Sequence, residues 1–186
     1  MNSSLFFNLF RFFILLSLQV IVFNNINLFG FISPFPYILF IILYPVNGNK
    51  SGLLVASFLL GIILDMFSNS GGIHTTASLL LAYFRPSIFK FAFGVSYEYQ
   101  TIKLNDTLTP ERFSFLLVAV VLHHLVLFIF EAFQFSLLWD ILIRTLLSSS
   151  ITLIICIIIK YVILIIVNRL ILHTFIFISI FFHCLT

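Results

Sequence analysis

Long apolar runs, separated by short polar, glycine-containing or proline-containing breaks, divide the chain into helix-sized segments. A membrane-spanning helix takes about 20 predominantly apolar residues, and most of these runs come close to that length. They lie at residues 5–23, 51–67, 73–93, 113–133 and 138–167, with a shorter run at 35–46. The pattern predicts an all-α polytopic membrane protein with about six transmembrane helices in a single domain, residues 1–167.

The last stretch, residues 168–186, is again apolar, but its uninterrupted part is short for an ordinary span. Apolar runs of that size are more typical of interfacial or re-entrant segments. We therefore expect a separate C-terminal tail that lies at the membrane surface, with a short extra helix as the alternative.

Composition agrees with the pattern, because 62% of the residues are apolar, 8% are charged and the mean hydropathy is +1.24. Soluble domains have about 25% charged residues, so the composition excludes a water-soluble fold and indicates a lipid bilayer as the environment. No basic run interleaved with aromatic residues is present, which argues against nucleic-acid binding.

Basic residues predict the orientation. If the amino terminus is cytoplasmic, six helices place Lys50, Lys90, Lys103, Arg112, Lys160 and Arg169 on or near the cytoplasmic side. The opposite loops, residues 24–34, 68–72 and 134–138, contain no Lys or Arg. Positive residues gather in cytoplasmic loops, so we expect a multi-pass membrane protein with its amino terminus in the cytoplasm.

Several charged residues fall inside the apolar runs, where ionisable groups are costly and suggest function by default. For Arg11 and Arg85 we favour a simpler interpretation, in which the long side chains reach the interface. Asp140 and Arg144 are four residues apart on one predicted helix, a spacing at which they can pair with each other.

Asp65 near the end of the third helix and His74 at the start of the fourth flank a glycine-rich tip. A tight turn could bring the carboxylate and the imidazole together, so we expect these residues to cap a helix or lock the hairpin. Contact with a partner protein or a ligand is the alternative.

His123, His124 and Glu131 are of metal-ligand types. Adjacent histidines point about 100° apart on a helix, which makes a shared ion difficult, and the HExxH spacing is lacking. We expect buried hydrogen bonds toward Asp65, Asp140 or Arg144 instead. Phosphate-binding glycine loops and GxSxG elbows are also missing from the sequence, so we expect no catalytic residues, cofactor or metal.

One stretch resembles the core of the rod shape-determining protein MreD family. A small-residue helix ends in Leu64-Asp65, a glycine-containing tip follows, and the next helix leaves through Ala82-Tyr83. The matching positions are Gly61, Asp65, Gly72, Ala82, Tyr83 and Pro86. An earlier segment, residues 31–45, is similar to the family's second helix, and the resemblance covers residues 5–167.

The resemblance implies a non-enzymatic subunit of the bacterial elongation machinery in the inner membrane, acting in cell shape and peptidoglycan synthesis. Its implied partners are an MreC-like protein, the MreB filament, RodA and a penicillin-binding transpeptidase. The implied fold is similar to the six-helix substrate-binding subunits of energy-coupling-factor vitamin transporters.

Small residues with a spacing of four on the third helix, at Gly52/Ala56 and Ser57/Gly61, would allow another helix to approach closely. We expect this flank and the tip to form a partner-binding or intramolecular docking surface. The candidate partner-binding or hairpin-locking residues are Gly61, Asp65, Gly72, His74, Tyr83, Arg85 and Pro86.

Two other classes of function remain open. A small-molecule transporter subunit would need an outward-facing pocket with convergent polar groups, which could come from Asn24, Asn25, Asn27, His74, Glu131 and Asp140. The first helix lacks an alanine-rich docking motif for an energising partner, which argues against this class. A membrane enzyme is supported only by the cluster of His, Glu and Asp residues.

Overall fold

The structure of this chain is a computed structural model that describes residues 3–94, 108–133 and 137–184. These residues form α1 (Ser3–Ile21), a 3-10 turn η1 (Phe23–Asn25), α2 (Ile38–Ile42), α3 (Lys50–Ser68), α4 (Ile73–Phe93), α5 (Pro110–Ala132) and α6 (Leu138–Cys184). Apart from one isolated bridge between Leu28 and Ile32, the described residues contain no β-structure. The predicted all-α class is confirmed for this part of the chain.

Four of the helical segments are long and apolar enough to cross a membrane. They are Phe7–Asn25, Lys50–Ser68, Pro110–Ala132 and Leu138–Ile163. Helix α4 is 21 residues long, but Arg85, Lys90 and several hydroxyl residues make it less apolar, and it is not among these four. The architecture is that expected of a multi-pass membrane protein.

Local sequence signals explain where the long helices begin and end. The Asn49 side chain accepts a hydrogen bond from the Ser51 amide at 3.0 Å and caps α3. Asn69 ends that helix in the left-handed conformation, which asparagine tolerates. Thr109 caps α5, and Pro110 occupies the first helical position, where its missing N–H costs nothing.

The segment between α1 and α3 runs from one end of the bundle to the other with little helix. It starts near Asn24, which donates to the Ser68 hydroxyl at 3.0 Å, and it ends near Asn49 at the start of α3. Only Ile38–Ile42 of the predicted run at 35–46 is α-helical, because prolines at positions 34, 36 and 45 interrupt the pattern.

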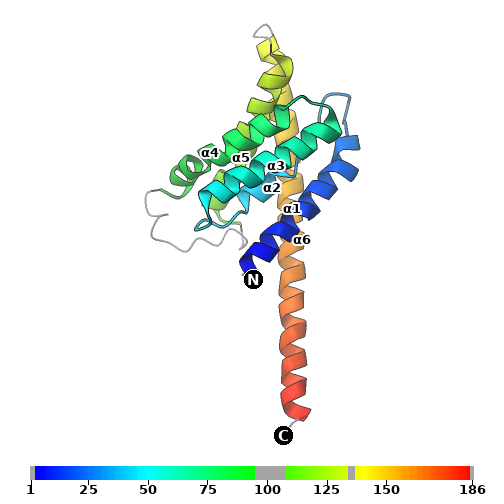
Figure 1. Ribbon diagram of the computed structural model, residues 1–186, viewed down its shortest axis with the longest axis vertical. Helices are drawn as coiled ribbons and strands as arrows, with labels where there is room; N and C mark the ends of the chain where they lie inside the picture. Colours follow the sequence, from blue (N-terminus) through cyan, green and yellow to red (C-terminus); the bar gives the residue numbers. More distant parts are fainter. Residues whose placement is uncertain (1–2, 95–107, 134–136, 185–186) are drawn as a thin grey trace.

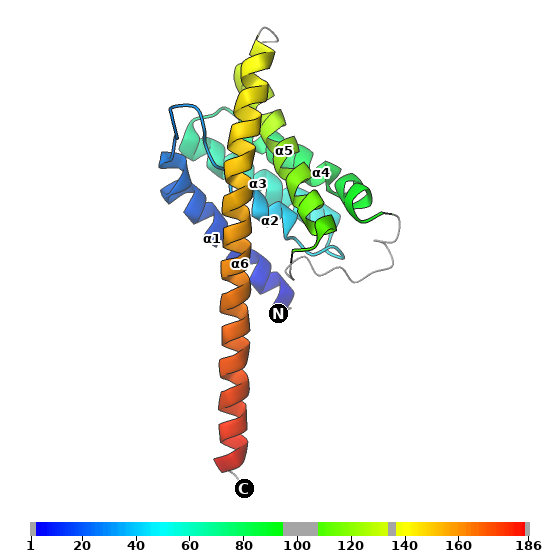
Figure 2. The ribbon, with the colours of Figure 1, turned by 180° about the vertical axis from the view of Figure 1, so that it is seen from behind.

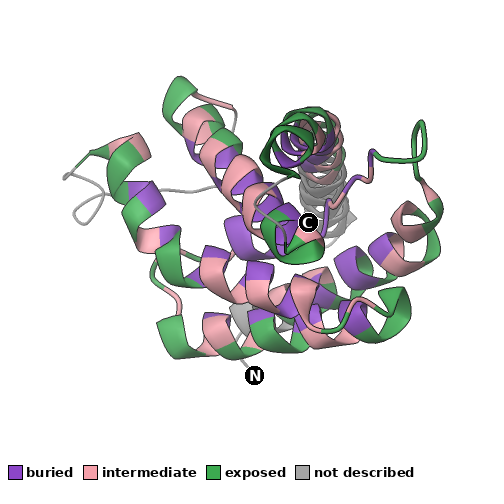
Figure 3. Cartoon of the chain, turned by 90° about the horizontal axis from the view of Figure 1, so that it is seen from above, coloured by how far each residue is buried: buried purple, intermediate pink, exposed green. Residues whose placement is uncertain are grey.

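This short helix lies at the centre of the fold. All five residues of α2 are buried, and they belong to one apolar core with residues of α1, α3, α4 and α5. The stacked rings of Phe89 and Phe115, with centroids 4.1 Å apart, join α4 to α5 within it. Figure 3 shows that the buried residues of the surrounding helices face inward, whereas exposed residues cover the outside.

Helix α6 lies along the longest axis of the molecule, and its C-terminal half extends beyond the other helices (Figures 1 and 2). It is 47 residues long, about 70 Å at 1.5 Å per residue. The sequence predicted that this helix would end near Val167, but the backbone continues as one helix through residues 168–184. The predicted interfacial location of the tail stays a prediction.

Charged side chains of the described residues divide between the two ends of the bundle. We call the end that holds the α3–α4 turn, residues 65–75, the tip end; Asp65, Glu131, Asp140 and Arg144 lie toward it. We call the opposite end, where α2 ends and α3 begins, the basic end. The basic residues that lie toward it are Arg11, Lys50, Arg85, Lys90, Arg112 and Lys160.

Candidate functional site

Asp65 ties the end of α3 to the beginning of α4. Its Oδ1 atom accepts from the Ser70 hydroxyl at 2.5 Å and from the His74 amide at 2.9 Å. Its Oδ2 atom accepts from the amide and the hydroxyl of Thr75, at 2.9 and 2.5 Å. A carboxylate at a helix N-terminus satisfies otherwise unpaired amides and interacts favourably with the helix dipole.

Glycines allow the two helices of this hairpin to approach and turn. A Cβ atom on Gly61 would lie 2.4 Å from the Thr75 Cα and 2.8 Å from its amide nitrogen, so only glycine fits without a shift of α4. Gly71 and Gly72 have φ values of +65° and +99°, which favour glycine. Gly61 therefore lies in an intramolecular contact.

The His74 imidazole does not contact the Asp65 carboxylate in the expected way, since only its backbone amide does so. The imidazole Nδ1 lies 3.2 Å from the Tyr37 hydroxyl, and the same hydroxyl lies 2.7 Å from His123 Nε2. Tyr37 and His123 are completely buried. A tyrosine thus bridges two histidines from different helices inside the core.

His124 completes this buried cluster. Its Nδ1 is 2.9 Å from the Val120 carbonyl and its Nε2 is 3.1 Å from the Thr152 hydroxyl on α6. The Thr152 hydroxyl also accepts from the Phe35 amide at 3.1 Å, which ties the segment before α2 to α6. The expectation that His123 and His124 bond to Asp65, Asp140 or Arg144 is wrong, because their partners are Tyr37, Thr152 and the Val120 carbonyl.

The predicted pairing of Asp140 with Arg144 is also wrong, whereas the expected bond from Glu131 to Arg144 is present, on an exposed pair of side chains. Arg144 Nη2 donates to Glu131 Oε1 at 2.9 Å and lies over the Phe128 ring, 4.8 Å from its centroid. The two side chains are 34% and 40% exposed. Exposed ion pairs of this kind contribute about 0–1 kcal/mol to the free energy of unfolding. This ion pair connects α5 to α6 at the tip end.

Two arginines hold the C-terminal end of α2 at the basic end. Arg85 Nη2 donates to the Ile42 carbonyl at 3.3 Å and to the Tyr44 carbonyl, while Arg11 Nη1 donates to the Leu43 carbonyl at 2.8 Å. Cations near the last carbonyls of a helix satisfy these unpaired acceptors. Arg85 is only 6% exposed, so its guanidinium is held within the fold, and its predicted position near the interface stays a prediction.

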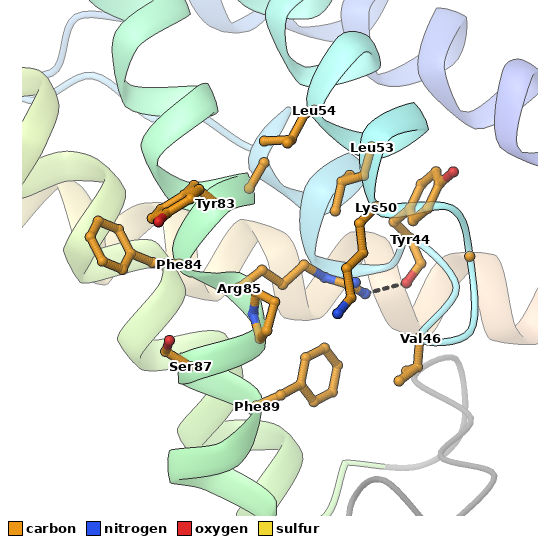
Figure 4. A pocket seen from close by; sticks show the side chains of 13 residues that line it. Tyr44, Val46, Lys50, Leu53, Leu54, Tyr83, Phe84, Arg85, Ser87 and Phe89 are labelled. Carbon is orange, nitrogen blue, oxygen red and sulfur yellow. Dashed lines mark hydrogen bonds between the residues drawn. The ribbon is translucent and has the colours of Figure 1, made fainter.

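A cavity of about 520 Å³ lies beside Arg85, between the start of α3 and the second half of α4. Figure 4 shows Lys50 and Arg85 extending toward each other at this site, with Tyr83 and Phe84 on one side and Tyr44 on the other. We call it the basic-end pocket. Its polar groups and its apolar walls can hold a ligand that carries both kinds of surface.

The seven predicted site residues therefore fall into two groups. Gly61, Asp65, Gly72 and His74 meet at the tip end, whereas Tyr83, Arg85 and Pro86 line the basic-end pocket. Sequence reasoning missed the roles of Tyr37 and Thr75. A hydroxyl residue directly after His74 at a helix start was a usable signal, but nothing local marked Tyr37 as a partner of distant histidines.

Among the described residues, no three His, Cys, Asp or Glu side chains gather closely enough to hold one metal ion. Comparisons with protein-family models, with curated proteins and with solved structures found no match to this chain.

Proposed function

We propose that this chain is a non-enzymatic, MreD-like subunit of the bacterial elongation machinery in the inner membrane. In this role it would couple an MreC-like protein and the MreB filament to the peptidoglycan synthase formed by RodA and a penicillin-binding transpeptidase. The observation that carries the proposal is the α3–α4 hairpin, in which Gly61, Asp65 and Gly72 of the family-like stretch act together as one structural unit.

The contacts of the buried polar groups support a scaffold. Asp65 is bonded to its own hairpin, and Tyr37, His74, His123 and His124 are bonded mainly to one another or to α6. Side chains that bond to each other inside a packed core specify one arrangement of the helices. A scaffold needs such a fixed arrangement in order to present a constant surface to its partners.

We propose six passes, with the segment between α1 and α3 as the second. Non-helical backbone at membrane depth is tolerated where protein buries it, as it buries Tyr37 and the whole of α2. Such a six-pass arrangement would be similar to that of the energy-coupling-factor substrate-binding subunits. The basic end faces the cytoplasm in this topology, in keeping with the positive-inside tendency.

A vitamin-type transporter subunit is the competing function. Three of the six polar groups that could form its outward-facing site are engaged elsewhere: Asn24 with Gln19 and Ser68, His74 with Tyr37, and Glu131 with Arg144. The basic-end pocket lies at the opposite end of the bundle from these groups. Both observations favour the scaffold.

Depletion of the protein from its own cells tests the proposal. We expect rod-shaped cells to become rounded, because peptidoglycan synthesis loses its guidance along the cell axis. Retained cell shape together with loss of uptake of one vitamin would overturn the proposal in favour of the transporter subunit. Genes for MreB, MreC and RodA next to this one would support it independently.

Partner binding is tested with the double variant Asp65→Ala, Gly61→Leu, which opens the α3–α4 hairpin. We expect weaker co-purification with the MreC-like protein at equal expression. Met66→Ala is the matched control, because this neighbouring side chain is 77% exposed and belongs to none of the hairpin bonds described above. Unchanged co-purification of the double variant would contradict a role for the hairpin in partner binding.

A further inference from the structure

The basic-end pocket collects positive charge that no acidic side chain balances. Arg85 and Lys50 both extend into it (Figure 4), and none of the described residues that line it is acidic. Arg85 lies over the Phe89 ring, 4.9 Å from its centroid, and donates to the Tyr44 carbonyl, whereas Lys50 is exposed. An anion placed between the two cations would interact favourably with both.

Arg85 has a hydrogen-bond donor to spare at this site. Its Nη2 group is engaged by the carbonyls at the end of α2, but its buried Nε has no acceptor. A buried donor without a partner is unfavourable; Arg144 Nε also lacks one, but only Arg85 combines this state with a place in the lining of the basic-end pocket. Guanidinium groups bind phosphate oxygens through parallel N–H bonds, and a small shift of the Arg85 side chain would let Nε, now covered by its neighbours, share an anion in the pocket.

The position of Lys50 points to the same chemistry. It is the first residue of α3, where the positive end of the helix dipole makes a cation unfavourable and an anion favourable. The charge of Lys50 therefore slightly lowers the stability of the protein when no anion is bound. The same helix end, together with the lysine, forms a favourable environment for an anion.

The remaining walls are apolar and partly open to the surroundings of the bundle. Leu53 and Leu54 line the α3 side, while Tyr83 and Phe84 on α4 are 68% and 43% exposed. In a bilayer these exposed rings would face lipid. A ligand with an anionic head and an apolar chain could place its head between the cations and its chain along these residues.

We propose that the basic-end pocket binds a phosphate group, held between Lys50 and Arg85, and that a membrane phospholipid supplies it. The site differs from the tip end, where Asp65 is satisfied within its own hairpin. It does not depend on the MreD-like role, because the argument uses only the cavity, its charges and the unpaired Nε.

Lipid retention by the purified full chain tests this proposal. The protein is delipidated in neutral detergent and titrated with short-chain phosphatidylglycerol, phosphatidylcholine or inorganic phosphate, and binding is followed by native mass spectrometry. We expect phosphatidylglycerol to bind more tightly than phosphatidylcholine. Weaker binding of inorganic phosphate would identify the lipid as the source, while equally tight binding would keep the phosphate site but assign it to a soluble ligand.

Variants make the assignment specific. Lys50→Gln should weaken binding of phosphatidylglycerol by about fivefold, because one cation near an anionic headgroup is lost. Arg85→Lys keeps the charge but removes the Nε donor, and we expect about a tenfold loss. Lys90→Gln is the matched control, since Lys90 is exposed in the last turn of α4 and does not line the pocket.

Two results would overturn the proposal. The first is binding that Lys50→Gln and Arg85→Lys leave unchanged in correctly folded protein. The second is an equal loss of binding in Lys90→Gln, which would show that only the general positive charge of this end attracts the lipid.

Discussion

Asp65 at the tip end and Arg85 at the basic end are both buried charges that hold the end of a helix, yet their surroundings differ. Asp65 accepts four hydrogen bonds from residues within ten positions along the chain. Arg85 reaches carbonyls more than forty positions away, keeps one donor unpaired and borders a cavity.

The difference separates a structural charge from one that is available to a ligand. The Asp65 carboxylate accepts all four of its hydrogen bonds from its own hairpin, so it is not available to bind a ligand. The guanidinium fixes α2 with one nitrogen, keeps its buried Nε without an acceptor, and belongs to the lining of a cavity that Lys50 also borders. Burial alone would not have distinguished these two residues.

The largest effect should come from Asp65→Ala. Removal of the carboxylate leaves two amides and two hydroxyls without their acceptor, so we expect the free energy of unfolding to fall by about 3 kcal/mol or more. Denaturant unfolding in detergent micelles, followed by circular dichroism, measures it. Met66→Ala on the exposed neighbour should change little, and a loss below about 1 kcal/mol in Asp65→Ala would contradict the structural role.

Arg85→Ala should cost less, about 2 kcal/mol in the same measurement. The variant frees the carbonyls of Ile42 and Tyr44, but it also removes the unpaired Nε donor. Lys90→Ala, on an exposed side chain of the same helix, serves as the control. A larger loss than that of Asp65→Ala would reverse the comparison between the two ends.

Tyr37→Phe tests the cluster that lies between these ends. The ring remains in place but the hydroxyl that bridges His74 and His123 is lost, and we expect a cost of about 1 kcal/mol. Tyr44→Phe is the comparison, because its exposed hydroxyl makes only a 3.4 Å bond to the Asn49 carbonyl. Nitrogen NMR of the histidine rings should change at His74 and His123 in Tyr37→Phe, and unchanged signals would refute the bridge.

The smallest effect on stability should come from Lys50→Gln. We expect the unfolding free energy of lipid-free protein to change by no more than about 0.5 kcal/mol, with a slight gain, because a cation leaves the N-terminus of α3. With phosphatidylglycerol present the wild type should be more stable than Lys50→Gln, since it binds the lipid more tightly and gains more from it. If Lys50→Gln is at least as stable as the wild type both with and without the lipid, Lys50 does not belong to the ligand site.

The positions of the helices could be predicted from the sequence because they depend on local signals. The predicted fourth helix, residues 73–93, has the bounds of α4, and the predicted third, 51–67, lies within one residue of α3. Apolar length, Asn49 and the glycine-rich turn carry this information within a few positions. The second helix was predicted too long, because prolines at positions 34, 36 and 45 confine it to Ile38–Ile42.

Site contacts could be predicted from the sequence mainly where both partners are close along the chain. The locking of the hairpin by Asp65 followed from the turn that joins α3 to α4. The pairs of Tyr37 with His123, Arg85 with the end of α2, and Glu131 with Arg144 join separate segments, and the last replaced a predicted contact within one helix. Local spacing shows which residues can meet, but not which competing partner lies nearer.

The sequence by itself determined that the described residues are mainly helical, that the helices have membrane-spanning character and where most of them lie, because apolar length and end signals act over short stretches. Tertiary structure alone decided that α2 is enclosed by the other helices, that Asp65 is satisfied and that Arg85 is not. These outcomes depend on how distant segments pack, since packing determines which donors and acceptors meet and where a cavity remains.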